Sequence, residues 1–218
     1  MEVKYRTIFR TPVLKHVLRL LTMLIFRLMG WKLKGHTPNV KKYVMIAAPH
    51  TSNWDFAFTL MFAFAFKMNM YVMGKKELFR WPFGYMFAWL GMIPIDRSKS
   101  NDIVGEAIEV FNQCESMSML VPPSGTRRKV RQWKTGFYHI ANGANVPIAL
   151  GFLDYGRKVG GFGPLFTPTG DVDADMMKIK AFYADISGLY PERTLHVSNS
   201  TSVSGSKSKE IAESGISC

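Results

Sequence analysis

The sequence predicts an α/β fold in which a mixed, mostly parallel sheet is flanked by helices. Short apolar runs typical of buried strands lie at residues 43–48, 117–121 and 146–152. Segments typical of helices lie at 101–115, before the second of these runs, and at 137–143, between the second and the third. Strands that alternate with helices along a chain are typical of a layered α/β fold. The 218 residues and 47% hydrophobic content are sufficient for one domain with a full core.

Residues 13–30 predict an N-terminal amphipathic helix that associates with a membrane. The run is mostly apolar but contains Lys15, Arg19 and Arg27. A membrane-spanning helix needs about 20 mostly uncharged residues, so this run is a poor span and is typical of a basic helix lying in the membrane interface. A core helix whose basic side chains reach the surface is the alternative. The Trp31 that follows the run favours the interface.

The hexapeptide from His50 to Asp55, His-Thr-Ser-Asn-Trp-Asp, is the strongest sign of chemistry. It follows a predicted strand that stops at Pro49 and precedes an apolar run, so it lies on a predicted strand-to-helix loop, where catalytic groups are often displayed. Across such a bend, the Asp55 carboxylate can hold one ring nitrogen of His50 protonated and leave the other free to take a proton. The alternative interpretation is that Asp55 only caps the helix and His50 is a half-buried loop residue.

The next segments are predicted to surround this loop. Residues 56–73 are apolar and predict a buried core helix, followed by a connection that contains Pro82. A short β-rich piece at 91–97 ends in Asp96-Arg97. Arg97 at a strand end is suited to bind a phosphate with two hydrogen bonds, whereas a surface ion pair with Asp96 is the commoner role.

A second candidate site follows the predicted strand at 117–121. Pro122 to Lys129 reads Pro-Pro-Ser-Gly-Thr-Arg-Arg-Lys, a glycine turn with clustered cations. Backbone amides and cations in such a turn can hold an anion, although a basic loop is more often simply solvated. Residues 171–182 then predict a helix with an acidic first turn.

Composition favours a lipid surface as the partner and argues against nucleic acid. The net charge of +12 accompanies high hydrophobicity, a combination that points to an anionic membrane. A nucleic-acid binder would place its aromatic and basic residues together on a polar surface, whereas the aromatic residues here lie in apolar runs. No metal site is expected, because His16, His36 and His196 lack partners at metal-ligand spacing.

Four segments in order resemble the conserved blocks of the glycerophospholipid acyltransferases. The hexapeptide resembles their H-x4-D block, and Gly91-Met-Ile-Pro-Ile-Asp-Arg97 resembles the second block. Pro123-Ser-Gly-Thr-Arg127 is similar to the third, usually Pro-Glu-Gly-Thr-Arg, and Val146-Pro147-Ile148 to the fourth. Across roughly residues 30–190, the chain resembles the bacterial 1-acyl-glycerol-3-phosphate acyltransferases of the PlsC type.

This resemblance implies the glycerolipid acyltransferase fold and the transfer of an acyl chain from a thioester to a lysophospholipid hydroxyl. It implies His50 as the general base and Asp55 as the residue that orients it. The implied acceptor site contains Arg97, Ser124, Gly125, Thr126 and Arg127, where the two arginines bind the acceptor phosphate and the glycine and threonine shape the turn. Acyl-coenzyme A or acyl carrier protein is the implied donor, and no cofactor is expected.

The chain departs from the family pattern at Ser124, which replaces the glutamate of the third block. An impaired relative that binds lipid without catalysis is therefore an alternative to the enzyme. The expected organisation is a membrane-associating segment at 1–32, an acyltransferase domain at 33–197 and a Ser-rich disordered tail at 198–218. The expected location is the cytoplasmic face of a membrane, as a peripheral or monotopic protein.

Overall fold

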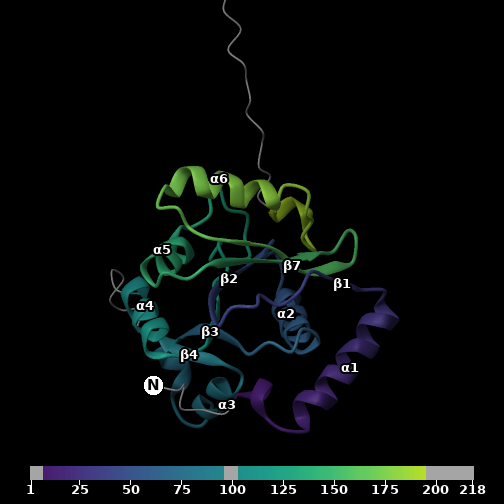
Figure 1. Cartoon of the computed structure of the whole chain (residues 1–218). Coiled ribbons are helices and arrows are strands. Elements are labelled where there is room, and N and C mark those ends of the chain that lie inside the picture. Colours follow the sequence, from purple (N-terminus) through teal and green to yellow (C-terminus); the bar gives the residue numbers. More distant parts are fainter. Residues whose placement is uncertain (1–6, 96–102, 195–218) are drawn as a thin grey trace, which may run out of the picture.

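The computed structural model describes residues 7–95 and 103–194 and has an α/β architecture (Figure 1). Asp96, Arg97 and the predicted tail lie outside the described residues. The strands are β1 (Lys32–Lys34), β2 (Lys42–Ala48), β3 (Met70–Lys75), β4 (Met92–Ile95), β5 (Met117–Leu120), β6 (Ile148–Asp154) and β7 (Val159–Phe166). The helices are α1 (Leu14–Met29), α2 (Trp54–Ala65), α3 (Gly84–Trp89), α4 (Ile103–Gln113), α5 (Gly136–Gly143) and α6 (Val172–Phe182), with short 3-10 turns η1 (Ile8–Arg10), η2 (Lys76–Phe79) and η3 (Pro191–Arg193).

The seven strands form one sheet in the order β1-β7-β6-β2-β5-β3-β4. Every neighbouring pair is parallel except β6 and β7, which are antiparallel. The predicted mixed, mostly parallel sheet flanked by helices is therefore confirmed. Because β2, β5 and β3 lie side by side in the same direction, the loops after their last residues gather at one edge of the sheet, where open α/β sheets commonly bind ligands.

Helices cover both faces of the sheet, and the alternation of side chains along β2 reflects these two layers. Val44, Ile46 and Ala48 join the core that contains α4, α5 and α6. Tyr43 and Met45 join the opposite core, which contains η1 and the inner face of α2. A strand buried on both faces is apolar along its whole length, which explains why the sequence made β2 easy to recognise.

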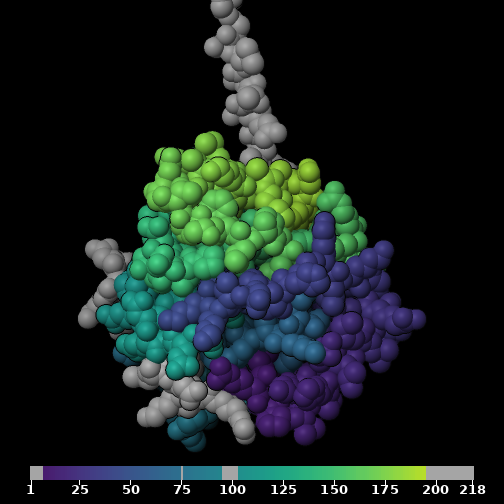
Figure 2. Space-filling model, viewed as in Figure 1, coloured from purple at the N-terminus to yellow at the C-terminus, as the bar shows by residue number. Residues whose placement is uncertain are grey.

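Helix α1 lies at the surface of the molecule (Figure 2), where it exposes an apolar stripe. Its inner face holds Phe26, which packs against Phe62 of α2 with the ring centroids 4.6 Å apart. The stripe that faces solvent consists of Val13, Val17, Leu20, Leu24 and Leu28, each more than half exposed. Among the described residues, no helix has the length and hydropathy required to cross a bilayer.

The prediction of one core helix over residues 56–73 is wrong, because the run contains α2 and β3. Helix α2 ends at Ala65, and the chain reverses through Lys67, whose φ is +56°. A continuous apolar run does not distinguish a buried helix from a buried strand. The sequence interpretation also did not foresee β1, β7 or α3.

Candidate active site

His50 lies just after β2, and Asp55 lies in the first turn of α2. The His50 Nδ1 atom is 3.2 Å from Asp55 Oδ2. The imidazole is 24% exposed and the carboxylate only 4%. The predicted pairing across the strand-to-helix loop is therefore present, with the imidazole open to a ligand and the carboxylate held behind it.

The Asp55 carboxylate is fixed by local backbone donors as well as by His50. Its Oδ2 atom accepts hydrogen bonds from the amides of Thr51 at 2.7 Å and Ser52 at 2.8 Å. The Ser52 hydroxyl in turn accepts a hydrogen bond from the Trp54 amide. These contacts satisfy backbone amides at and just before the start of α2, whose N-cap residue, Asn53, makes no side-chain cap hydrogen bond. Asp55 is therefore not the N-cap of α2, but it holds the preceding loop and is also the partner of His50, so a structural role does not exclude the pairing with His50.

The surroundings of Asp55 favour its charged form. Burial raises the pKa of this carboxyl, but the hydrogen bonds from His50, the Ser52 amide, Tyr155 and the Thr51 amide outweigh burial and lower the pKa below its ordinary value. The positive end of the α2 dipole also favours an anion at this position. Asp55 is therefore ionised at neutral pH and can stabilise a protonated imidazole.

Tyr155 completes the shell around this carboxylate, although it lies 100 residues away in the sequence. Its hydroxyl donates to Asp55 Oδ1 at 2.8 Å. Burial and the neighbouring Asp55 both raise the pKa of Tyr155, so the hydroxyl keeps its proton and acts as a donor. The ring packs edge-on against Trp31 and Phe58, with centroids 5.2 and 5.5 Å away. These contacts fix the hydroxyl in position.

His50 and Asp55 open onto a cavity of about 250 Å³. Its apolar lining includes Ala47, Phe56, Val72, Met92, Leu120 and Leu153. Among the described residues that line it, Arg127 is the one arginine or lysine, so a negative group and an apolar chain can be bound side by side. Of the predicted phosphate-binding arginines, Arg127 thus reaches the His50 cavity, whereas Arg97 lies outside the described residues.

The turn of the third motif lies against His50 on another side. Ser124 lines a narrow hollow of about 20 Å³ together with His50, Arg128 and Arg193. The Ser124 hydroxyl donates to the Thr126 carbonyl at 2.7 Å, which closes the turn. Gly125 has a φ of +62°, a left-handed conformation that glycine adopts without strain. Gly125 and Thr126 shape the turn but line neither this hollow nor the larger cavity.

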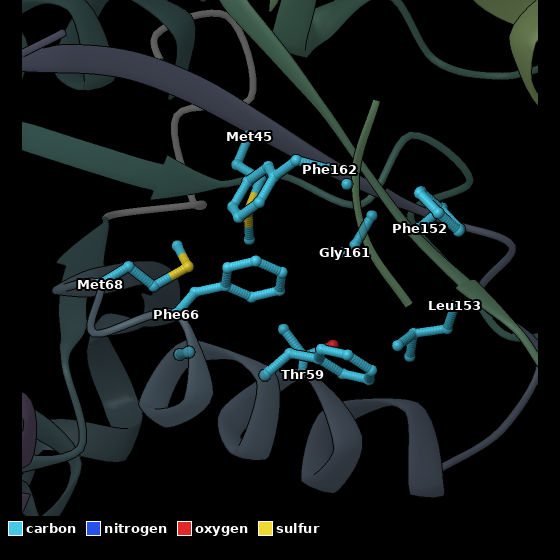
Figure 3. Close-up of a pocket in the computed structure, with 12 residues that line it drawn as sticks. Met45, Thr59, Phe66, Met68, Phe152, Leu153, Gly161 and Phe162 are labelled. Atoms are coloured by element: carbon cyan, nitrogen blue, oxygen red, sulfur yellow. The ribbon is translucent and has the colours of Figure 1, made fainter. Parts of the chain in front are cut away.

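A second apolar space continues inward from the large cavity (Figure 3). Ala47, Thr59 and Leu153 line both spaces, so the two adjoin. The inner space lies between α2 and the sheet, and Figure 3 shows Phe66 and Thr59 on the helix side facing Met45 and Phe162. It is narrow, with an open volume of about 30 Å³.

Two functional neighbours, Tyr155 and Arg193, were not foreseen from the sequence. Arg193 Nη1 donates to the Thr51 carbonyl at 3.3 Å, and its guanidinium lies 4.4 Å from the centre of the Tyr190 ring. Both residues reach the loop from distant parts of the chain, and no spacing rule links them to His50. Within residues 7–95 and 103–194, no group of three or more His, Cys, Asp or Glu side chains is arranged to hold a metal ion.

Comparison with known proteins identifies the family and the fold. The acyltransferase family model matches residues 32–149, more than half of the chain. No curated protein matches the chain. The fold is similar to the crystal structure of the 1-acyl-sn-glycerophosphate (LPA) acyltransferase PlsC from Thermotoga maritima, with a TM-score of 0.54, 17% identity, and coverage of 80% of this chain and 82% of that chain. The family resemblance of the motifs is therefore confirmed: the chain belongs to the acyltransferase family and has the PlsC fold.

Proposed function

We propose that the protein transfers an acyl chain from an acyl-thioester to the free hydroxyl of a lysophospholipid. The default acceptor is 1-acyl-glycerol-3-phosphate, and the product is then phosphatidic acid. The observation that carries the proposal is the His50–Asp55 pair, which opens onto a cavity that combines apolar walls with Arg127. The structurally similar T. maritima protein is a 1-acyl-sn-glycerophosphate acyltransferase, which supports the same acceptor.

In the proposed reaction, His50 acts as the general base. Asp55 binds the Nδ1 side of the imidazole, which leaves Nε2 to accept the proton of the acceptor hydroxyl. The hydroxyl oxygen then forms a bond to the thioester carbonyl carbon, the carbon–sulfur bond breaks, and the thiolate leaves and regains a proton from His50. No covalent acyl-enzyme and no cofactor are required. Acyl-coenzyme A or acyl carrier protein serves as the donor.

The cavities suggest where the substrates bind. Arg127 is exposed at the cavity and is suited to bind the phosphate of the acceptor with paired hydrogen bonds. We assign the acyl chain of the donor to the apolar wall that runs from Leu120 and Met92 toward Ala47 and the inner space under α2. The thioester carbonyl then lies at His50, between the phosphate site and the acyl site.

We further propose that α1 binds a membrane surface. Val13, Val17, Leu20, Leu24 and Leu28 form an exposed apolar stripe, and the helix also carries Lys15, Arg19 and Arg27. A basic helix with an unburied apolar face is typical of proteins that lie in the interface of an anionic bilayer. Because the thiol carriers are cytoplasmic, the proposed location is the cytoplasmic face, as a peripheral or monotopic protein.

The proposal is tested by measuring thiol release from palmitoyl-coenzyme A with and without lysophosphatidic acid. We expect acceptor-dependent release by the wild type and a loss of about 10²–10⁴-fold in kcat for His50→Ala, the usual contribution of a positioned general base. His139→Ala is the matched control, because His139 is an exposed histidine on α5. It should leave the rate unchanged.

Two results would contradict the proposed chemistry. Acceptor-dependent release that survives His50→Ala would exclude His50 as the base. Equal background release by the wild type and His50→Ala, repeated with an acyl carrier protein donor and with other lysophospholipids, would instead favour the lipid-binding relative without activity. A double substitution in the exposed stripe, Leu20→Lys/Leu24→Lys, separately tests α1, because it should release the protein from anionic vesicles.

A further inference from the structure

The segment between β3 and β4 exposes a group of large apolar and aromatic side chains. Trp81 is 87% exposed, Tyr85 76%, Phe83 60%, Met86 45% and Leu78 41%. We refer to residues 78–86 as the aromatic segment. It contains part of η2 and the start of α3, so its backbone is ordered by local structure. Water-exposed aromatic side chains grouped in this way are characteristic of an interaction surface.

The aromatic segment is joined to the N-terminal end of α1. Trp89, at the end of α3, donates its indole N–H to the Thr11 hydroxyl at 3.3 Å. Phe9 of η1 and Trp89 belong to one hydrophobic cluster, which also includes Leu14 of α1. Figure 1 shows α3 and the start of α1 side by side at one end of the molecule, with α6 at the other end. Helix α3, with which the aromatic segment ends, and the start of α1 therefore lie next to each other.

The segment is also linked to the catalytic cavity through the two strands that flank it. It connects β3 to β4, and Val72 of β3 and Met92 of β4 form part of the wall of that cavity. Residue Lys75, the last of β3, leads directly into η2. A surface that binds here lies beside the strands on which the proposed acyl site is built.

The charges around the segment indicate the kind of partner. Arg10, Lys76 and Arg80 are exposed cationic residues at this end of the molecule, and Glu77 is the acidic residue among them. Trp and Tyr prefer the interface of a bilayer, where the ring meets the acyl chains and the polar atom meets water. A second copy of the chain would bring a net charge of +12 against the same cations, which disfavours self-association.

We propose that the aromatic segment is a second membrane-binding element that inserts Trp81 and Phe83 into the interface of an anionic bilayer. This inference depends on the proposed function only because both have the membrane as a partner. Two contact sites, α1 and the aromatic segment, fix the rotation of the protein on the surface, whereas a single helix leaves it free to roll. The β3–β4 side of the cavity is then held next to the lipid from which a lysophospholipid enters.

The test uses the full chain and vesicles of phosphatidylcholine with phosphatidylglycerol. Trp81→Ala/Phe83→Ala should weaken partitioning onto these vesicles by about tenfold, since each ring withdraws apolar surface from water on insertion. Both side chains are exposed, so the substitution should leave the thermal unfolding temperature unchanged. Met177→Ala is the matched control, because Met177 is 68% exposed on α6, at the opposite end. It should bind as the wild type does.

The depth to which Trp81 inserts into the bilayer is measured independently of the affinity for vesicles. Lipids brominated on their acyl chains should quench part of the tryptophan fluorescence of the wild type, and this part should be absent in Trp81→Phe. Unchanged partitioning of the double variant, or unchanged quenching in Trp81→Phe, would overturn the inference. A wild-type dimer in solution that dissociates in the double variant would also overturn it, because the segment would then bind a second copy.

The outcomes separate this inference from the proposed function. If only Leu20→Lys/Leu24→Lys reduces vesicle binding, α1 is the membrane element and the aromatic segment is not. If the double variant of the segment reduces binding and quenching but the wild type releases no thiol with any acceptor, the surface is correct and the proposed reaction is wrong.

Discussion

The assignment of the acyl chain makes a quantitative prediction for Ala47→Leu. Ala47 is half-buried on β2 and lines both the His50 cavity and the inner space under α2. Leucine adds three carbon atoms at the junction of the two spaces. A long acyl chain that passes this point loses room for about three methylene groups, whereas a short chain that ends before it does not.

The size of the effect follows from the hydrophobic transfer of those groups. Each buried methylene contributes about 0.8 kcal/mol, so three contribute about 2.4 kcal/mol. Because about 1.4 kcal/mol corresponds to a tenfold change in an equilibrium or rate ratio, the preference for a long over a short donor should fall roughly 50-fold. The preference is the ratio of kcat/KM for palmitoyl-coenzyme A to that for octanoyl-coenzyme A.

The assay compares both donors on the same protein preparation, so partial unfolding of the variant cancels from the ratio. Overpacking of the strand can cost about 1–3 kcal/mol of stability, and it would reduce both rates equally. A ratio equal to that of the wild type would refute the placement of the acyl chain along Ala47. A larger loss for the octanoyl donor would refute it as well.

Three further predictions concern the loop around His50. Tyr155→Phe removes the hydrogen bond to Asp55 Oδ1. The free energy of unfolding in urea should therefore fall by about 1–3 kcal/mol. The acid limb of kcat/KM should also move to higher pH, because the carboxylate then interacts more strongly with a protonated imidazole. An unchanged pH profile would limit Tyr155 to a role in stability. Since folding lowers the pKa of Asp55, its contribution to stability is fully present above the unfolded value of about 4 and is lost as the pH falls through the folded pKa. Urea unfolding from pH 7 to pH 3 should therefore show a smaller acid destabilisation for Asp55→Asn than for the wild type, and equal slopes would contradict this linkage. Finally, Ser124→Glu should raise kcat/KM for the acceptor. Position 124 lies in a hollow with Arg128 and Arg193, and these two arginines can orient a carboxylate. No change or a loss in kcat/KM would show that Ser124 does not limit the enzyme.

The parts of the site that could be predicted from the sequence are those formed by neighbouring residues. His50 and Asp55 lie five residues apart across one strand-to-helix bend, and the hydrogen bonds of Asp55 with the Thr51 and Ser52 amides span four and three residues. Such contacts follow from local backbone geometry. The fold class was equally accessible, because buried parallel strands such as β2 are continuous apolar runs.

The parts that could not be predicted depend on contacts between distant segments. Tyr155 reaches Asp55 across 100 residues, and Arg193 reaches Thr51 across 142, so neither leaves a periodic signal. Strand β7 was missed because its glycines, among them Gly161, obscure the strand pattern. There the chain approaches β1 so closely that a Cβ atom on Gly161 would collide with the Lys34 carbonyl. A β-propensity scale considers single residues and does not include contacts with a neighbouring strand such as β1.

The contacts that sequence patterns do not reveal also connect the proposed membrane surface to the chemistry. Trp31 lies two residues beyond the end of α1, and its ring packs edge-on against Tyr155. Tyr155 donates to Asp55, and Asp55 holds His50. The helix proposed to lie on the bilayer is therefore linked to the proposed base through one packed aromatic cluster, which Phe26 joins from α1 and which contacts Tyr155, and side chains packed in this way are held with little freedom. A loss of packing at Trp31 would release the Tyr155 hydroxyl and leave Asp55 Oδ1 without that donor. The position of α1 thus bears on the orientation of His50 as well as on access to lipid.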